Sequence, residues 1–421
     1  MTTAIESTPR AYDPLSISPL SFWSKTAAER DETFRVLRAE RPVSWHPPIE
    51  GALMPPENAG VWAVTSHRLI TEVSKKPDIF CSGLGVQLEE VPADILEAAS
   101  SFLALDAPRH PALRKLISSA FTPKQVAKIH DQIKNQARVI VDDMLAVGDG
   151  EFDFVHQVSK RLPMWTIYEM LGLPASQRDE AAHMADAMVA WADEDVAAGR
   201  APVELLNDSL VGLLMMGIEF AQERRKNPAS DLMTNLVQAE VDGVRLTDDE
   251  IASFFVLLSV AGNDTTRNTI SLGLKTLQDF PEQKALLLED FDGRIGTATE
   301  ELVRWVTPVM TFRRTATQDT VLGGQEIKKG EWVATMFSSG NRDESVFTDP
   351  HVFDITRSPN PHVGFGGGGP HYCMGNFVAK IQLREIFDQL LHRVPNLQVG
   401  EPSYLVGNFV HAVKHLPATL R

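Results

Sequence analysis

The sequence predicts a mainly helical α+β fold. Four helical patterns follow one another between residues 123 and 226, with short turns between them. A longer helix begins at the capping box of Thr247 and Glu250 and is stopped by Pro281, which gives it roughly 32 residues. Short apolar runs elsewhere, such as residues 61–65, are typical of strands in small sheets.

The composition allows a large core and argues against several classes of partner. No charge block, Gly/Ser-rich linker or repeat divides the 421 residues, so we expect one domain over residues 1–421, partly irregular over residues 1–26. The net charge of −16 disfavours nucleic acid as a general partner. No apolar run could form a membrane anchor, and two distant cysteines give no disulfide framework. We therefore expect a monomeric, cytoplasmic protein.

One of the two cysteines, Cys373, follows four consecutive glycines at residues 366–369 and precedes an amphipathic helical pattern. Consecutive glycines let the backbone take positive φ and approach a flat ligand closely. A thiol at the start of a helix feels the positive end of the helix dipole, which lowers its pKa and favours an iron-binding thiolate. Two alternatives are a buried structural cysteine and a phosphate cradle, although no Lys followed by Ser or Thr completes a phosphate-binding pattern.

The middle of the long helix contains residues that a buried helix normally avoids. Its first half is apolar all round, which indicates burial. Gly262 costs about 1 kcal/mol relative to alanine in a helix, and Asp264 and Thr265 compete for backbone hydrogen bonds. The presence of these unfavourable residues in a buried helix needs an explanation. A simple kink is one alternative, and a functional groove is another.

Two further patterns place charged residues at helical spacing. His110 and Arg114 are four apart, so on a helix they would share a face and could hold a carboxylate. Glu301 and Arg304 are three apart on another expected helix. Pairs of either kind more often lie on a solvated face, where they contribute little.

The cysteine segment resembles the heme-binding loop of the cytochrome P450 superfamily. The matching residues are Phe365, Gly366, His371, Cys373 and Gly375. Between Phe365 and Cys373 the chain has one residue more than the commonest spacing of that signature. A bacterial group acting on steroids and methyl-branched lipids is similar in this longer loop. The resemblance implies that Cys373 is the axial ligand of the iron of heme b and that the other matching residues contact the heme.

The resemblance covers nearly the whole chain and implies roles for other motifs. AGNDTT is similar to the AGxDTT signature of the family, which implies a dioxygen groove at Ala261 and Gly262 and a proton relay through Asp264 and Thr265. The residues implied to bind the heme propionates are His110, Arg114 and Arg314. The residues implied to form a buried structural network are Glu301, Arg304 and Arg357.

The resemblance also implies a substrate pocket. Its expected lining residues are Leu88, Leu258, Val309, Met310 and Phe409. Leu88 belongs to residues 82–101, a loop and short helix that in the family closes over the substrate. The alternative is a surface loop that packs its leucines into the core.

The implied activity is hydroxylation, with dioxygen, of a hydrophobic small molecule such as a steroid, a methyl-branched lipid or a terpenoid. No flavin or nicotinamide domain is encoded, so the electrons would come from a ferredoxin and its reductase. We expect the ferredoxin to dock on a basic face that comprises Arg109, Arg114, Lys115 and Lys380. Two alternatives are a heme-thiolate peroxygenase and a non-catalytic carrier of heme or a hydrophobic ligand. The known peroxide-using branch lacks the acid and alcohol that Asp264 and Thr265 supply here.

Overall fold

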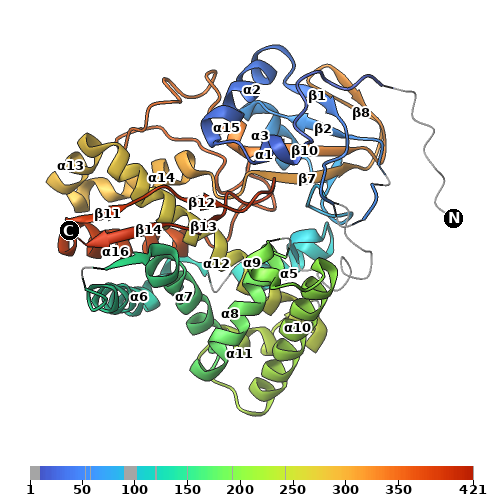
Figure 1. The fold of residues 1–421 in the computed structure, drawn as a ribbon. Helices are drawn as coiled ribbons and strands as arrows, with labels where there is room; N and C mark the ends of the chain where they lie inside the picture. Colours follow the sequence, from blue (N-terminus) through green and yellow to red (C-terminus); the bar gives the residue numbers. More distant parts are fainter. Residues whose placement is uncertain are drawn as a thin grey trace.

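Helices dominate the architecture (Figure 1). The computed structural model describes residues 10–52, 54–56, 58–89, 102–118, 121–148, 150–191, 193–241 and 243–420. The α-helices are α1 Leu20–Trp23, α2 Ala27–Glu40, α3 His67–Lys75, α5 Arg109–Ser118, α6 Pro123–Leu145, α7 Arg161–Leu171, α8 Ala175–Val189, α9 Glu194–Ala197, α10 Pro202–Lys226, α11 Leu232–Gln238, α12 Asp248–Asp279, α13 Pro281–Glu289, α14 Phe291–Val306, α15 Phe337–Gly340 and α16 Asn376–Arg393. The four helices expected between residues 123 and 226 are confirmed as α6, α7, α8 and α10.

The strands form small sheets, as the short apolar runs predict. They are β1 Val43–His46, β2 Val61–Val64, β3 Phe80–Cys81, β4 Glu151–Asp153, β5 Glu240–Val241, β6 Val244–Arg245, β7 Thr311–Ala316, β8 Thr320–Leu322, β9 Gln325–Ile327, β10 Trp332–Met336, β11 Leu397–Val399, β12 Ser403–Tyr404, β13 Val413–His415 and β14 Pro417–Leu420. The largest sheet has the order β1-β2-β10-β7-β3, in which only the β2–β10 pairing is parallel. In its register Val333 of β10 pairs with both Trp62 and Arg314.

The long helix α12 has the bounds that its local signals predict. The capping box is present, because Thr247 accepts from the Glu250 amide while the Glu250 carboxylate accepts from the Thr247 amide. The helix runs for 32 residues and ends just before Pro281. It contacts α7, α8, α10, α14 and α16, which explains why its apolar half is buried. The polar residues in its middle do not interrupt the helical backbone.

The sheet of β1, β2 and β10 lies with α2, α3 and α15 in the upper part of Figure 1, and α6 to α11 lie below it. The helix α12 passes between these two parts. The carboxyl-terminal strand β14 pairs with β4 and β11, both antiparallel. Within the described ranges, none of the helices combines the length and the apolar character needed to span a bilayer.

Candidate active site

A large cavity separates α12 from the loop that contains Cys373. Its volume is about 1660 Å³, and most of its wall is apolar. The expected residues that line it from α12 are Leu258, Ala261, Gly262, Asp264 and Thr265. Those that line it from the loop are Phe365, Gly366, His371, Cys373 and Gly375. The fold therefore brings together two motifs that lie far apart in the sequence.

The sulfur of Cys373 lies at the cavity wall just before α16. The Cys373 amide donates to the carbonyl oxygen of Phe365 (2.9 Å), which closes the loop. Cys373 keeps exposed surface on the cavity side, but the surrounding protein atoms desolvate the thiol and raise its pKa. The amides of Gly375 and Asn376 and the charge of Arg114 act in the opposite direction. The lowered pKa expected from the sequence is therefore wrong for the free thiol, because desolvation outweighs the amide donors. A bound metal cation removes the thiol proton outright, so amides already directed at the sulfur fit a metal-bound thiolate.

The glycine run serves the packing of the loop as well as the cavity. Gly366 has a φ of 102° and lines the cavity, and a Cβ there would meet nothing closer than 3.8 Å. Gly369 has a φ of 76°, and a Cβ there would overlap the carbonyl oxygen of Ser74 in α3. The sequence predicts close approach to a flat ligand for the whole run. Only part of the run has that role, because Gly369 is required by the contact with α3.

Basic side chains gather beside the loop. Arg114, Arg314 and His371 line the cavity, and the ring of His110 packs against that of His371 with centroids 4.0 Å apart. Burial lowers the pKa of His110 to about 4 and that of His371 to about 3. His110 Nε2 and His371 Nδ1 are buried, and neither has a hydrogen-bond partner among the described residues. Two guanidinium groups beside ring nitrogens that lack partners fit a ligand that carries carboxylates.

Asp264 lies at the cavity wall in a network of charges that links α12 to α8. The Asp264 carboxylate contacts the Arg267 guanidinium, and Arg267 Nη1 donates to Asp186 Oδ1 (2.8 Å). Asn263 Nδ2 donates to the same oxygen of Asp186 (3.1 Å). Burial raises the pKa of Asp264 to about 7, with Arg267 opposing this shift and Asp186 adding to it. A carboxyl group that titrates near neutral pH can both release and regain a proton.

Thr265 lies beside Asp264 on the same wall. Its hydroxyl donates to the carbonyl oxygen of Ala261 (3.1 Å), one turn earlier in α12. Gly262 lies between the cavity and α7, and a Cβ there would approach Ile167 Cδ1 to 3.1 Å. The small residue at 262 therefore also allows α7 and α12 to pack closely. Thr265 lines the space facing Cys373, and Asp264 lies on the same wall with its carboxylate oxygens buried against Arg267.

Three of the five expected pocket residues, Leu258, Val309 and Phe409, line the cavity. Leu88 and Met310 do not. Both are buried in an apolar cluster that includes α1 and α2 side chains, so their assignment to the pocket is corrected. Met310 follows Val309 at the start of β7, and successive residues of an extended chain face opposite sides. Residues 90–101 of the segment expected to close over the substrate lie outside the described residues.

Several cavity residues were missed by the sequence reading. Phe312 lines the wall beside Phe409, with ring centroids 5.3 Å apart, and Trp191 lines it from the end of α8. Glu89 also lines the cavity, next to Asn408. No motif marks these positions.

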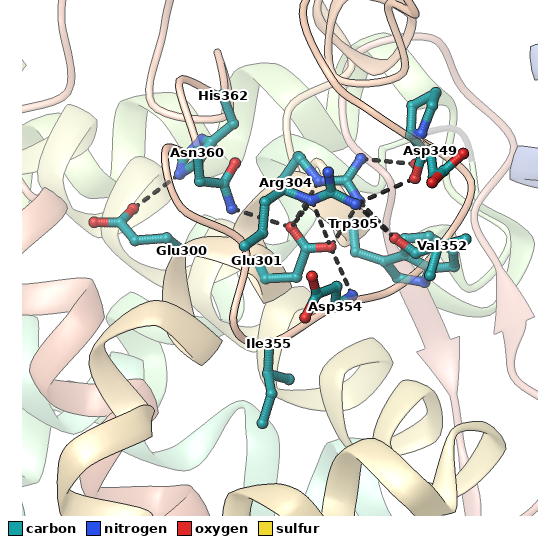
Figure 2. A network of polar contacts seen from close by, with 12 residues as sticks. Glu300, Glu301, Arg304, Trp305, Asp349, Val352, Asp354, Ile355, Asn360 and His362 are labelled. Atoms are coloured by element: carbon teal, nitrogen blue, oxygen red, sulfur yellow. Dashed lines mark hydrogen bonds and ion pairs between the residues drawn. The ribbon is translucent and has the colours of Figure 1, made fainter.

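The expected network of Glu301, Arg304 and Arg357 is present beside the segment that leads into the Cys373 loop (Figure 2). Arg304 binds both carboxylate oxygens of Glu301 at 2.7 Å, and both side chains are 0% exposed. Asn360 Nδ2 and the Asp354 amide each donate to Glu301 at 3.0 Å. The carboxylate is thus enclosed by donors, and it ties α14 to the chain between β10 and α16.

The basic face expected to receive a ferredoxin is partly neutralised by acidic neighbours. Arg109 contacts Glu250, and Lys380 Nζ lies 2.5 Å from Glu300 Oε1. Arg114 donates to the carbonyl oxygen of Tyr372. Lys115 on α5 is exposed. The role of this face stays a prediction.

Comparison with known proteins identifies the family. A family model described as Cytochrome P450 matches residues 61–395. A methyl-branched lipid omega-hydroxylase of Mycobacterium tuberculosis is 39% identical over 422 residues, which cover 99% of this chain and 98% of that protein. A steroid C26-monooxygenase of Mycolicibacterium smegmatis is 39% identical over 390 residues, which cover 91% of this chain and 89% of that protein.

Solved structures of cytochrome P450 proteins have the same fold as this chain. A Mycobacterium marinum cytochrome P450 in complex with pseudoionone is 54% identical, with a TM-score of 0.95, and the match covers 98% of this chain and 100% of that chain. Members of this family use a heme iron, dioxygen, a redox partner and hydrophobic substrates. The mainly helical α+β fold expected from the sequence is confirmed. The chain belongs to the cytochrome P450 family of monooxygenases.

Proposed function

We propose that this monooxygenase hydroxylates a methyl-branched, largely apolar molecule, namely a branched lipid, a steroid or a terpenoid. The observation that carries the proposal is the apolar cavity of about 1660 Å³ that has Cys373 on one wall and Asp264 with Thr265 on another. The printed activities of the two mycobacterial relatives, a lipid omega-hydroxylase and a steroid C26-monooxygenase, support this substrate class. The pseudoionone complex supports it too, because pseudoionone is a methyl-branched unsaturated ketone.

The cofactor is proposed to be heme b. Cys373 would bind the iron, and Arg114 and Arg314, with His371 and the adjacent His110, would bind the propionates. When bound, the heme supplies the redox chemistry that reduces and splits dioxygen. Asp264 and Thr265 would hold and transfer the protons that this reaction consumes, and the apolar wall would exclude bulk water from them.

The electron donor is proposed to be a ferredoxin with its reductase, docking on the face of α5 and α16 that carries Lys115. Glu301, Arg304 and Arg357 are proposed to act in folding and heme retention. We propose a cytoplasmic location, because the reducing cytoplasm keeps a metal-binding thiol reduced. We also propose that the chain forms a single domain and is a monomer. Of the alternatives, a peroxygenase or a carrier would have no use for the carboxyl group of Asp264, whose pKa burial raises to about 7.

A titration of the purified holoenzyme with sterols, branched fatty acids and terpenoid ketones tests the proposal. Binding should change the heme absorption as the distal water is displaced, and a ferredoxin, its reductase and dioxygen should convert the bound compound to an alcohol. Cys373→Ser should abolish the red-shifted absorption of the CO-bound ferrous form. Product formed with peroxide but never with dioxygen and electrons would favour the peroxygenase, and binding without any product would favour the carrier.

A further inference from the structure

Glu89 places a carboxyl group in the wall of a mainly apolar cavity. Three other buried or half-buried carboxylates of this wall are ion-paired: Asp264 contacts Arg267, Asp193 lies 3.0 Å from Lys414 Nζ, and Glu331 lies 2.8 Å from Arg10 Nη1. Glu89 is bonded differently. One of its oxygens accepts a hydrogen bond from a neutral group, the side-chain amide of Asn408.

The environment of Glu89 favours the uncharged acid. Burial raises the pKa of Glu89, and the opposing effects of its own backbone amide, the Asn408 hydrogen bond and the Arg313 charge do not cancel this increase. The side chain is nonetheless not fully enclosed, and it lines the cavity, so its accessible part faces the ligand space. In the protonated form of Glu89, the carbonyl oxygen can accept the hydrogen bond from Asn408. The hydroxyl group then remains free to donate a hydrogen bond to a ligand.

Asn408 is held firmly, so it can position Glu89. Asn408 is 1% exposed, and its main-chain carbonyl oxygen accepts a hydrogen bond from the Thr311 hydroxyl at 3.0 Å. On the other side, the Arg313 amide donates to the carbonyl oxygen of Val86 (2.8 Å), which fixes the segment before Glu89 along β7. Two segments and one strand therefore determine where the carboxyl group lies. This differs from a mobile surface glutamate.

We propose that Glu89 is a specificity-determining residue that donates a hydrogen bond to an uncharged carbonyl oxygen of the substrate, with Asn408 positioning it. A few well-placed polar groups in an apolar pocket set the orientation of a ligand. The substrate class is thereby narrowed to a branched hydrocarbon that carries a ketone or ester group, which Glu89 binds while the hydrocarbon part occupies the apolar space before Cys373. This inference rests on the proposed hydroxylase function and names the substrate chemistry of the same site.

The test compares two ligands on three forms of the holoenzyme: wild type, Glu89→Leu and Glu89→Gln. The ligands are pseudoionone and the hydrocarbon of the same skeleton in which a methylene group replaces the carbonyl. The dissociation constant of each is measured from the change in heme absorption. Wild type should bind the ketone more tightly than the hydrocarbon. Glu89→Leu should lose about tenfold in affinity for the ketone alone, because a buried carbonyl loses its donor.

Glu89→Gln is the matched control, because its amide can both accept from Asn408 and donate to a carbonyl group. It should keep most of the preference for the ketone. If the role of Glu89 is merely structural, Glu89→Leu should lose affinity for both ligands equally, and that result would overturn the inference. A wild-type enzyme that does not bind the ketone more tightly than the hydrocarbon would also overturn it. Heme content and the CO-bound spectrum of each variant show that it is folded. If wild type prefers the ketone but hydroxylates neither ligand, the proposed function fails and the assignment of Glu89 stands.

Discussion

Two buried acid–guanidinium pairs in this molecule have the same spacing and different surroundings. Glu301 and Arg304 on α14, and Asp264 and Arg267 on α12, are each three residues apart on a helix. Glu301 is enclosed by side-chain and backbone donors. Asp264 contacts Arg267, but neither of its oxygens makes a well-oriented hydrogen bond to any described residue, and burial raises its pKa to about 7.

The difference shows that spacing alone does not decide what a buried pair does. A carboxylate whose oxygens are bound by several donors suits a fixed joint between segments. A carboxylate that is buried and shares one guanidinium with a second acid, Asp186, is easily protonated. We therefore expect substitutions in the first pair to affect folding and substitutions in the second to affect proton transfer.

The largest effect should follow Glu301→Gln. This change leaves the buried Arg304 and the half-buried Arg357 without their counter-charge, so the free energy of unfolding should fall by about 3–5 kcal/mol. Urea unfolding, with the heme recovered per mole of protein as a second measure, would show it. Glu300→Gln is the control, because its carboxylate is partly exposed, and it should cost about 1 kcal/mol or less. Similar losses in the two variants would contradict the structural role of the network.

Asp264→Asn should mainly slow turnover. The amide has the shape of the acid but cannot transfer its proton, so product formation at saturating substrate should fall by about a hundredfold. Its unfolding free energy should change less than that of Glu301→Gln. The exposed Asp249 in the first turn of the same helix provides a control. If Asp249→Asn slowed turnover equally, the slower turnover would reflect a general disturbance of α12 rather than the loss of proton transfer by Asp264.

Thr265→Ala should have a smaller effect on rate and a clear effect on coupling. Without the hydroxyl that bonds to Ala261, proton delivery is disordered, so the fraction of consumed dioxygen released as peroxide should rise several-fold. Thr265→Ser keeps the hydroxyl and should remain coupled. Oxygen uptake measured beside peroxide and product gives the ratio. Unchanged coupling in the alanine variant would argue against the relay.

The smallest effect should follow Asp186→Asn. The charge of Asp186 adds to the pKa of Asp264, so its removal should lower that pKa. Since the acid form of Asp264 is the proton donor, turnover should decline as pH rises through about 7 in the wild type. In Asp186→Asn this decline should begin at lower pH. A pH profile of product formation at saturating substrate measures the shift, and a shift to higher pH would refute the coupling between the two acids.

Local signals predicted what local interactions determine. The capping box at Thr247 and the stop at Pro281 gave the bounds of α12, because both act within one turn of the helix ends. The spacing of Glu301 and Arg304 predicted a pair, and resemblance to the family added Arg357. Neither could reveal Asn360 or the Asp354 amide, since those reach Glu301 only after a long irregular segment has folded.

Residues of the cavity wall were harder to predict. Alternation around β7 could not tell which of Val309 and Met310 faces the cavity, because both sides of that strand are buried. Asp186 lies on another helix, so the sequence around Asp264 could not predict that Asp186 would lie beside it. A single glutamate in a loop has no periodicity to mark it, and Glu89 was passed over for that reason.

The contact between Gly369 and Ser74 links the length of the cysteine loop to helix α3. A bulkier residue at 369 has no room unless α3 retreats, and a retreat of α3 would disturb the β-sheet on which that helix packs. A side chain at position 369 therefore requires a compensating shift at the end of α3. A chimera that exchanges only one of these two segments should pack poorly at this contact.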